Sequence, residues 1–447
     1  MGSELVDTAT GRLLWGLRES KWYIRAWCQG EGLAPLHLTP DELNGRYGRV
    51  HPGKLLKFPA FMPFLHGVEP YRNLTAEVNR VSVHPDAVLE FPYDWRLPVA
   101  YNAVCLRRAA QIHLEQWRQH PEQLKARRAW GGEEARLVII AHSMGGLLAR
   151  HMVAMEDAPL DIRATVTLGT PFFGSVKAAL LLHNGLGAPF PLKHSRVHAL
   201  AVTLPGVYDL LPNYRCVDEQ TDARTLTPAD IATIGGSEEL ADRAMTARSF
   251  VRNVALPGHV QVFGAQQHTP QSLTLNGGKA AVHRYTCKRS SVGAIDRVDL
   301  AGDGTVSSEA ARLPGLAAMP IAQSHGALSK TREALVVVRH VLTGQDTGPW
   351  EGAGLLGMDV PDVVEAGQPF EILFDGVERP THVSCAVTNL DGNRPIHIPV
   401  ANLIDGRCRI RTVFADPGIY RISAATGGAS PVVQLVLVAD READQAR

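Results

Sequence analysis

The sequence lacks several features that would place it in a class at once. Its 45 Lys and Arg residues balance 45 Asp and Glu residues, so no excess of charge indicates a nucleic acid or an anionic surface as partner. No apolar run is long enough to span a membrane. The first residues, M-G-S-E-L-V-D-T-A-T-G, also lack the basic and apolar segments of a signal peptide. As written, the sequence predicts a cytoplasmic protein with no nucleic-acid partner.

Cysteine is scarce and scattered. The 447 residues include six cysteines, and none stands in a C-x-x-C pair. This spacing indicates core thiols rather than a metal site or a disulfide framework, and we expect no metal or organic cofactor. Cys385 and Cys408 are the pair to test for a bridge.

The first three quarters of the chain alternate between apolar runs and helical patterns, which is typical of an α/β domain with parallel strands. The expected strands are 88–95, 137–141, 164–171 and 260–265. The expected helices are 103–117 and 327–342, the second closed by Gly344 as its C-cap. These elements predict an α/β domain over residues 1–344.

Two long segments, 10–85 and 172–255, fit neither the strand nor the helix pattern. The first is rich in tryptophan, phenylalanine and proline. Insertions of this size in α/β enzymes usually form caps or lids over an active site. We therefore expect both to lie over the site, although aromatic residues are more often plain core.

The pattern changes after a Gly-rich linker at 345–354. Short alternating apolar runs, of which V-V-Q-L-V-L-V at 432–438 is the last, are separated by turn signals such as D-G and D-P-G. This spacing predicts a small all-β, immunoglobulin-like sandwich over 355–447.

Four apolar residues lead almost directly into Ser143 in L-V-I-I-A-H-S-M-G-G at 137–146. The stretch is close to the G-x-S-x-G nucleophile elbow, with Ala141 at the first glycine position and Gly145 at the second. Such a turn exposes the serine hydroxyl, and it starts a helix whose positive end favours a developing oxyanion. Small-x-Ser-x-Gly also occurs by chance, but the strand before it and the helix after it favour function. We predict Ser143 as nucleophile and the Met144 N–H as an oxyanion donor.

A nucleophilic serine needs a base and an orienting carboxylate, which follow it in the order Ser, Asp or Glu, His on this kind of fold. Asp303 stands between two glycines in D-L-A-G-D-G-T-V at 299–306. His325 stands in a loop immediately before the last predicted helix. Each signal is weak alone, and together they favour these two residues.

The competing candidates are Asp296, Asp299, His283 and His340. Neither aspartate has the paired glycines. His340 lies inside a predicted helix, and His283 precedes the carboxylate in the chain, which is the wrong order.

Several motifs then occur in a familiar order: F-P-Y-D-W-R at 91–96, A-H-S-M-G-G at 141–146, L-G-T-P-F-F-G-S at 168–175 and G-D-G-T-V at 302–306. The chain resembles the lecithin:cholesterol acyltransferase family, including its bacterial lipase/acyltransferase-like members, over roughly residues 2–343. The resemblance implies an α/β-hydrolase that acts on lipid or other carboxylic esters through an acyl-serine intermediate. Motif by motif, it makes Ser143 the nucleophile, Asp303 the orienting carboxylate and His325 the general base.

The same resemblance implies a mobile lid at about 176–200, although this stretch could equally be one buried helix. It also places the aromatic 10–85 segment where family members contact lipid, so the cap could touch a membrane surface peripherally. The run A-A-L-L-L-H-N-G-L-G at 178–187 suits a lid, since it is apolar and contains glycines that could act as hinges.

The resemblance also predicts a gap. Family members begin this domain with a strand that ends in Pro-Gly, and Gly2-Ser3-Glu4-Leu5 corresponds only to the end of that motif. The strand beside the nucleophile strand, and the second oxyanion amide, are therefore expected to be missing. Three explanations stay open: a longer natural chain, for which secretion is also open; another segment, such as 22–27, in the gap; or a catalytically impaired relative. The last would act as a binding or adhesion protein through its sandwich.

Overall fold

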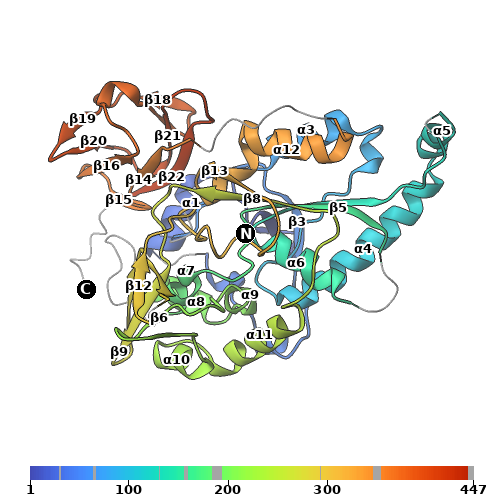
Figure 1. Ribbon diagram of the computed structural model, residues 1–447, viewed down its shortest axis with the longest axis horizontal. Coiled ribbons are helices and arrows are strands. Elements are labelled where there is room, and N and C mark those ends of the chain that lie inside the picture. Colours follow the sequence, from blue (N-terminus) through green and yellow to red (C-terminus); the bar gives the residue numbers. More distant parts are fainter. Residues whose placement is uncertain are drawn as a thin grey trace.

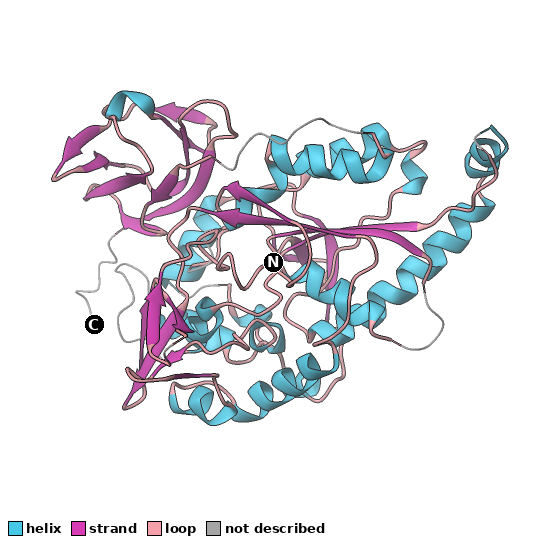
Figure 2. Ribbon diagram, in the orientation of Figure 1, coloured by secondary structure: helices cyan, strands magenta, loops and turns pink. Residues whose placement is uncertain are grey.

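The computed structural model describes residues 1–29, 32–63, 67–129, 131–155, 160–183, 194–291, 293–345 and 354–440. Its centre is a four-stranded parallel sheet in the order β13-β8-β5-β4 (Figures 1 and 2). The strands are β4 (Leu137–His142), β5 (Ile162–Leu168), β8 (His259–Ala265) and β13 (Ala318–Ala322). The chain thus has a mixed α/β fold with a parallel sheet.

Helices cover both faces of this sheet. α3 (Arg72–Val81) and α12 (Arg332–Thr343) lie on one face, where Val337 and Val338 pack with Val166 and Val262 of the strands. α4 (Val99–Gln119) and α6 (Met144–Val153) pack together on the other face. Burial on both faces explains why the strands are nearly continuous apolar runs in the sequence.

Most elements predicted for this part are confirmed. β4, β5, β8 and α4 coincide with the expected segments within a few residues, and α12 ends at Gly344 in the left-handed conformation (φ 67°). The predicted start of the last helix at 327 is wrong. A 3-10 helix, η4 (His325–Lys330), precedes α12, and the side chain of Thr331 accepts the N–H of Ala334 as a new N-cap.

The strand predicted at 88–95 is also wrong. These residues are described, but no strand is assigned there, and β4 is the edge of the sheet as far as the described residues go. A strand exists only when a neighbour pairs with it, and the described residues supply no such neighbour for 88–95.

A separate antiparallel sheet forms near the N-terminus from β2 (Leu13–Trp15), β1 (Ser3–Asp7) and β3 (Val50–Leu55). Residues 22–27 lie in α1 (Ser20–Ile24) and in the π-helix η1 (Arg25–Gln29). They therefore add no strand beside β4, and the suggestion that 22–27 fill the predicted gap is wrong. Their tryptophans and Tyr23 are buried and meet Trp15 edge to face, which is the plain core arrangement.

The remaining elements of this part are α2 (Pro40–Leu43), α5 (Pro121–Ala129), α7 (Val176–Leu182), α8 (His194–Ala201), α9 (Pro205–Tyr208), α10 (Pro228–Thr233), α11 (Glu238–Phe250), β6 (Val217–Asp218), β7 (Ala223–Arg224), β9 (Ser272–Asn276), β10 (Lys279–His283), β11 (Thr286–Arg289), β12 (Ile295–Val298), and the 3-10 turns η2 (Ala34–Leu36) and η3 (Pro85–Ala87). Within the stretch expected as a lid, α7 is buried almost all round. Residues 184–193 of that stretch lie outside the described residues. The described helices include none that is both long and apolar enough to cross a bilayer.

Beyond residue 354 the described chain is almost entirely β-structure. One sheet has the order β14-β16-β20-β19 and the other the order β15-β22-β21-β17-β18. The elements are β14 (Gly357–Asp359), β15 (Val363–Glu365), β16 (Pro369–Asp375), η5 (Pro380–His382), β17 (Ser384–Asn389), β18 (Arg394–Ile396), β19 (Asn402–Ile404), β20 (Arg407–Val413), β21 (Gly418–Ala425) and β22 (Val432–Ala439). Side chains of both sheets, among them Ile372 and Val436, form one buried cluster.

Cys385 and Cys408, the pair singled out for a test, form no bridge. Both thiols are free, and they lie on β17 and β20, which belong to different sheets. Of the predicted 345–354 linker, residues 346–353 lie outside the described part of the chain.

Candidate active site

Ser143 occupies the sharp turn between β4 and α6. Its backbone has φ 54° and ψ −128°, a conformation that residues other than glycine rarely adopt. The turn is held because Ser143 N–H donates to Leu168 O at 2.9 Å. A Cβ on Gly146 would lie 2.1 Å from Thr170 Oγ1, so the first turn of α6 packs too closely for any larger residue there. This crowding accounts for the glycine at 146, whereas a Cβ on Gly145 would make only an ordinary contact, 3.6 Å from Ala141 Cβ.

The structure brings Ser143, His325 and Asp303 together, although up to 182 positions separate them in the chain. Ser143 Oγ lies 2.7 Å from His325 Nε2, and His325 Nδ1 lies 2.7 Å from Asp303 Oδ2. His325 is 6% exposed and Asp303 is fully buried. The three side chains form one continuous hydrogen-bonded line.

Asp303 is fixed by its own loop. Its second carboxylate oxygen, Oδ1, accepts the N–H of Thr305 at 2.9 Å and of Val306 at 2.6 Å. Its backbone oxygen accepts His325 N–H at 2.8 Å. The glycines on either side are required by this tight path: a Cβ on Gly302 would lie 2.3 Å from Val306 O, and Gly304 has φ 86°.

The rival candidates lie elsewhere. Asp296 is exposed on β12, and Asp299 accepts the side-chain amide of Gln271 at 2.6 Å. His283 is on β10, where its ring stacks on Tyr285, and His340 is within α12. None of them is described as bonded to the serine.

His142, the residue before the serine, is a neighbour that sequence reasoning missed. Its Nε2 lies 3.0 Å from the backbone oxygen of His325, and its Nδ1 lies 2.9 Å from Tyr71 Oη. Burial lowers the pKa of His142 to about 3, an effect to which the nearby His325 adds. A neutral ring with its proton on Nε2 donates to His325 and accepts from Tyr71. The A-H-S run carries no signal that reveals this, because the partners come from distant loops.

Met144 is the first residue of α6, so its N–H is one of those that a helix leaves without an intrahelical acceptor. It follows Ser143 directly. The N–H of the residue after the nucleophile is where an oxyanion donor is expected, and the role of the Met144 N–H stays a prediction.

A cavity of about 520 Å³ begins at Ser143 and His325 and runs along β4; we call it the edge cavity. Its lining includes the whole of β4, Leu74 and Val78 of α3, Leu106 and Ala110 of α4, and the first three residues of the chain. Residues 87–91 line it as well, so it separates them from β4. The lining is mostly apolar, and it lies where the sequence analysis expects a strand to be missing.

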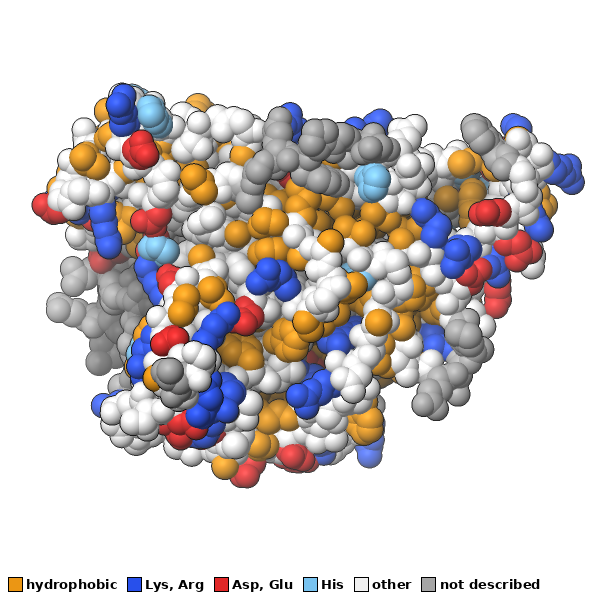
Figure 3. Space-filling view, viewed as in Figure 1, with side chains coloured by type: hydrophobic (Ala, Val, Ile, Leu, Met, Phe, Trp, Pro, Cys, Tyr) orange, Lys and Arg blue, Asp and Glu red, His pale blue; other side chains and the backbone are white. Residues whose placement is uncertain are grey.

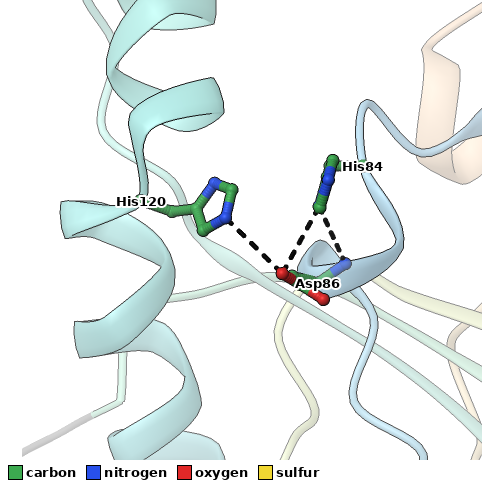
Figure 4. Close-up of side chains that lie close together, drawn as sticks. All are labelled: His84, Asp86 and His120. Carbon is green, nitrogen blue, oxygen red and sulfur yellow. Dashed lines mark hydrogen bonds and ion pairs between the residues drawn. The ribbon is translucent and has the colours of Figure 1, made fainter.

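One group of described side chains could hold a metal ion: His84, Asp86 and His120 (Figure 4). Asp86 Oδ2 lies 3.6 Å from His84 Nδ1 and 3.5 Å from His120 Nε2. However, the Nδ1 atoms of His84 and His120 each accept a backbone N–H, from Asp86 and Glu122 respectively, so neither Nδ1 lone pair is free for a metal ion. These three side chains are better explained as a polar contact between η3 and the end of α4 than as a metal site.

Two solved structures show a distant likeness to this chain. A Bacillus licheniformis lipase, BlEst2 in its propeptide form, is similar at 13% identity and a TM-score of 0.29, with 76% of this chain and 83% of that chain covered. The Legionella pneumophila phospholipase PlaB, in complex with thio-NAD, is similar at 9% identity and a TM-score of 0.20, with 78% and 79% covered. These scores are too low to carry an argument. No curated protein matches the sequence.

The family model described as lecithin:cholesterol acyltransferase matches residues 62–291, just over half of the chain. This range is shorter than the expected 2–343. It contains Ser143 and ends before Asp303 and His325. The chain belongs to the lecithin:cholesterol acyltransferase family.

Proposed function

We propose that this protein is a serine acyl-hydrolase or acyltransferase of α/β-hydrolase fold that acts on lipid or other carboxylic esters. The observation that carries the proposal is the line of two 2.7 Å contacts from Asp303 through His325 to Ser143. A hydroxyl, an imidazole and a buried carboxylate in this order are the arrangement that activates a serine. Family membership supports lipid ester chemistry in general.

Each residue then has a defined task. His325 Nε2 takes the Ser143 proton while Oγ attacks the ester carbonyl carbon. Asp303 holds the imidazole with Nε2 toward the serine and stabilises the positive ring. The carbonyl oxygen becomes an oxyanion beside the Met144 N–H and the positive end of α6. The tetrahedral intermediate collapses, and the leaving alcohol takes the proton from His325.

The acyl-serine that remains is released by a second attack. Water, or an acceptor alcohol, gives its proton to His325 Nε2 and its oxygen to the acyl carbon, and Ser143 recovers its proton. Water makes the protein a hydrolase and an alcohol makes it a transferase.

The edge cavity supports an acyl chain as the part of the substrate that is held. It opens at Ser143, and apolar side chains of α3 and α4 face β4 across it. We propose that the chain of the ester lies along β4 in this cavity. Hydrophobic side chains also gather across the middle of the face in Figure 3, which supports a peripheral lipid contact.

We also propose that the chain has two domains, an α/β-hydrolase domain at residues 1–344 and a β-sandwich that begins at residue 355. The buried cluster shared by the two C-terminal sheets supports the sandwich.

A fluorophosphonate probe and a panel of p-nitrophenyl and phospholipid esters test the function. We expect the wild-type chain to be labelled and active, and Ser143→Ala to lose both. Ser249→Ala, at an exposed serine of α11, is the matched control and should keep both. A folded wild-type protein that is neither labelled nor active would refute the proposal and favour the binding role.

A further inference from the structure

The C-terminal β-region lies against the loop that carries His325. We propose that residues 431–433, at the start of β22, position His325 for the reaction proposed above, on which this inference rests. The C-terminal β-region would then contribute to catalysis by holding His325, rather than serve as a separate domain.

β22 is buried on both of its faces. Val436 and Val438 point into the core of the C-terminal region, whereas Leu435 and Leu437 belong to the main core cluster that also contains Trp15. All eight residues of the strand are buried. A strand buried on both sides has little freedom to move, so it is a firm support for whatever it touches.

The loop before His325 is bonded to this strand by two consecutive residues. Gln323, 1% exposed, donates its side-chain N–H to Pro431 O at 2.8 Å and accepts Val433 N–H at 2.8 Å. Ser324, 6% exposed, donates its hydroxyl to Val433 O. The side chains thus bind the backbone of β22 much as a paired strand would.

A second set of contacts anchors the other side of the histidine. The buried Glu69 binds Arg421 of β21, at 2.7 Å from Nη2, and Lys330 of η4 at 3.0 Å. Glu69 N–H also donates to Gly326 O at 3.0 Å. Burial raises the pKa of Glu69, but the two cations outweigh it and the net pKa is lowered, so the carboxylate is charged.

These contacts fix the backbone of residues 323–326, and His325 is the one residue among them that reaches Ser143. Gln323 and Ser324 do not line the edge cavity, and their described hydrogen bonds do not include Ser143, so they are positioning residues. Displacement of a reacting group by about 1 Å can cost on the order of 10²-fold in rate. Loss of the bonds should therefore lower kcat more than it changes KM.

Gln323→Met tests the positioning role, because methionine has nearly the volume of glutamine but makes none of its side-chain hydrogen bonds. Gln434→Met is the matched control, because Gln434 is also buried, lies on β22 itself, and donates to Val360 O at 2.9 Å within the C-terminal region. Both variants of the full chain are compared by kcat and KM on p-nitrophenyl butyrate, by the rate of fluorophosphonate labelling, and by thermal unfolding.

We expect Gln323→Met to lose between about tenfold and a hundredfold in kcat and in labelling rate with KM unchanged. Gln434→Met should keep kcat even where its unfolding temperature falls as far. Equal kcat in both variants, whether unchanged or lowered, would overturn the positioning role. If Gln323→Met does not fold, Ser324→Ala replaces it with the same expectation. A wild-type chain inert to ester and probe refutes the proposed function itself, and the inference with it.

Discussion

The two edges of the central parallel sheet differ. Next to β13, the loop that carries His325 is bonded to residues 431–433 at the start of β22, and Gln323, Ser324 and Val433 are all buried. Next to β4, which leads into Ser143, lies the edge cavity. The nucleophile thus stands at an open side of the sheet and its base at a supported side. The difference separates two tasks, since a base must be held in place whereas a nucleophile must be reached by substrate.

The largest expected effect tests the supported side directly. Asp303→Asn keeps the size of the side chain but removes the negative charge that faces His325 Nδ1. We expect kcat on p-nitrophenyl butyrate to fall by about 10⁴-fold, as for a misoriented imidazole, with the circular dichroism spectrum unchanged. Asp299→Asn, a few residues earlier, is the control. If Asp303→Asn retains more than a tenth of the activity, another carboxylate orients the base.

Gly326→Ala tests how tightly the histidine loop is held. A Cβ at this position would lie 2.0 Å from the backbone oxygen of Gly67, so the loop or residue 67 must move. We expect kcat to fall by on the order of 10²-fold, because His325 is the adjacent residue. Gly293→Ala is the control for backbone strain alone, because its φ is 84° but no atom lies within 4 Å of the added carbon. Unchanged kcat in Gly326→Ala would show that the loop adjusts without moving the base.

His142 joins the two sides, because it lies on β4 and its ring reaches His325 O. Its pKa is about 3 in the folded chain, whereas an unfolded histidine titrates near 6.5. Between these values the unfolded state binds the extra proton, so stability falls as the pH falls below 6.5. From pH 7 to pH 5 this one group should remove about 2 kcal/mol from the free energy of unfolding.

His142→Gln removes that titration. Urea unfolding at pH 7 and pH 5 should show a loss smaller by about 2 kcal/mol in the variant than in the wild type. The exposed His51→Gln should keep the wild-type difference. A variant that loses as much stability as the wild type would mean that His142 is protonated in the folded chain.

The sequence predicts the candidate catalytic residues better than it predicts the contacts that hold them in place. Strand β4, the turn at Ser143, the G-D-G loop and the histidine before the last helix each carry a local signal, and the structure joins them. The contacts of Gln323 with β22 have no such signal, because their partners lie more than 100 residues away. Long-range pairing of single polar side chains leaves no periodic pattern in a sequence.

A strand is predicted correctly from its residues only where the neighbouring strands and packing faces that its apolar pattern implies are present. Residues 88–95 have the composition of a strand, but no neighbour pairs with them. The run V-V-Q-L-V-L-V at 432–438 is predicted from the sequence as one of several short alternating runs of a small β-sandwich. Its apolar residues are in fact nearly continuous because the α/β part covers the second face of β22. Successive apolar positions in one run therefore indicate a strand that is covered on both faces.

The smallest expected effect concerns the open side. Val78 of α3 lines the edge cavity and is only partly buried. In Val78→Trp the larger ring occupies part of the space that we assign to the acyl chain. Excluding about two methylene groups costs about 1.6 kcal/mol of binding, so kcat/KM for p-nitrophenyl palmitate should fall by about tenfold. Hydrolysis of the butyrate ester should be unaffected, because a short chain does not reach the ring.

The ratio between the two esters is the decisive quantity, since any general damage to the site lowers both rates. Val298→Trp, at a half-exposed valine of β12 outside the cavity, should leave the ratio unchanged. If Val78→Trp also leaves it unchanged, the acyl chain lies elsewhere. The cavity would then be better explained by the backbone of β4, whose outer edge pairs with no strand among the described residues. An added polypeptide strand satisfies such an edge, whereas an acyl chain cannot.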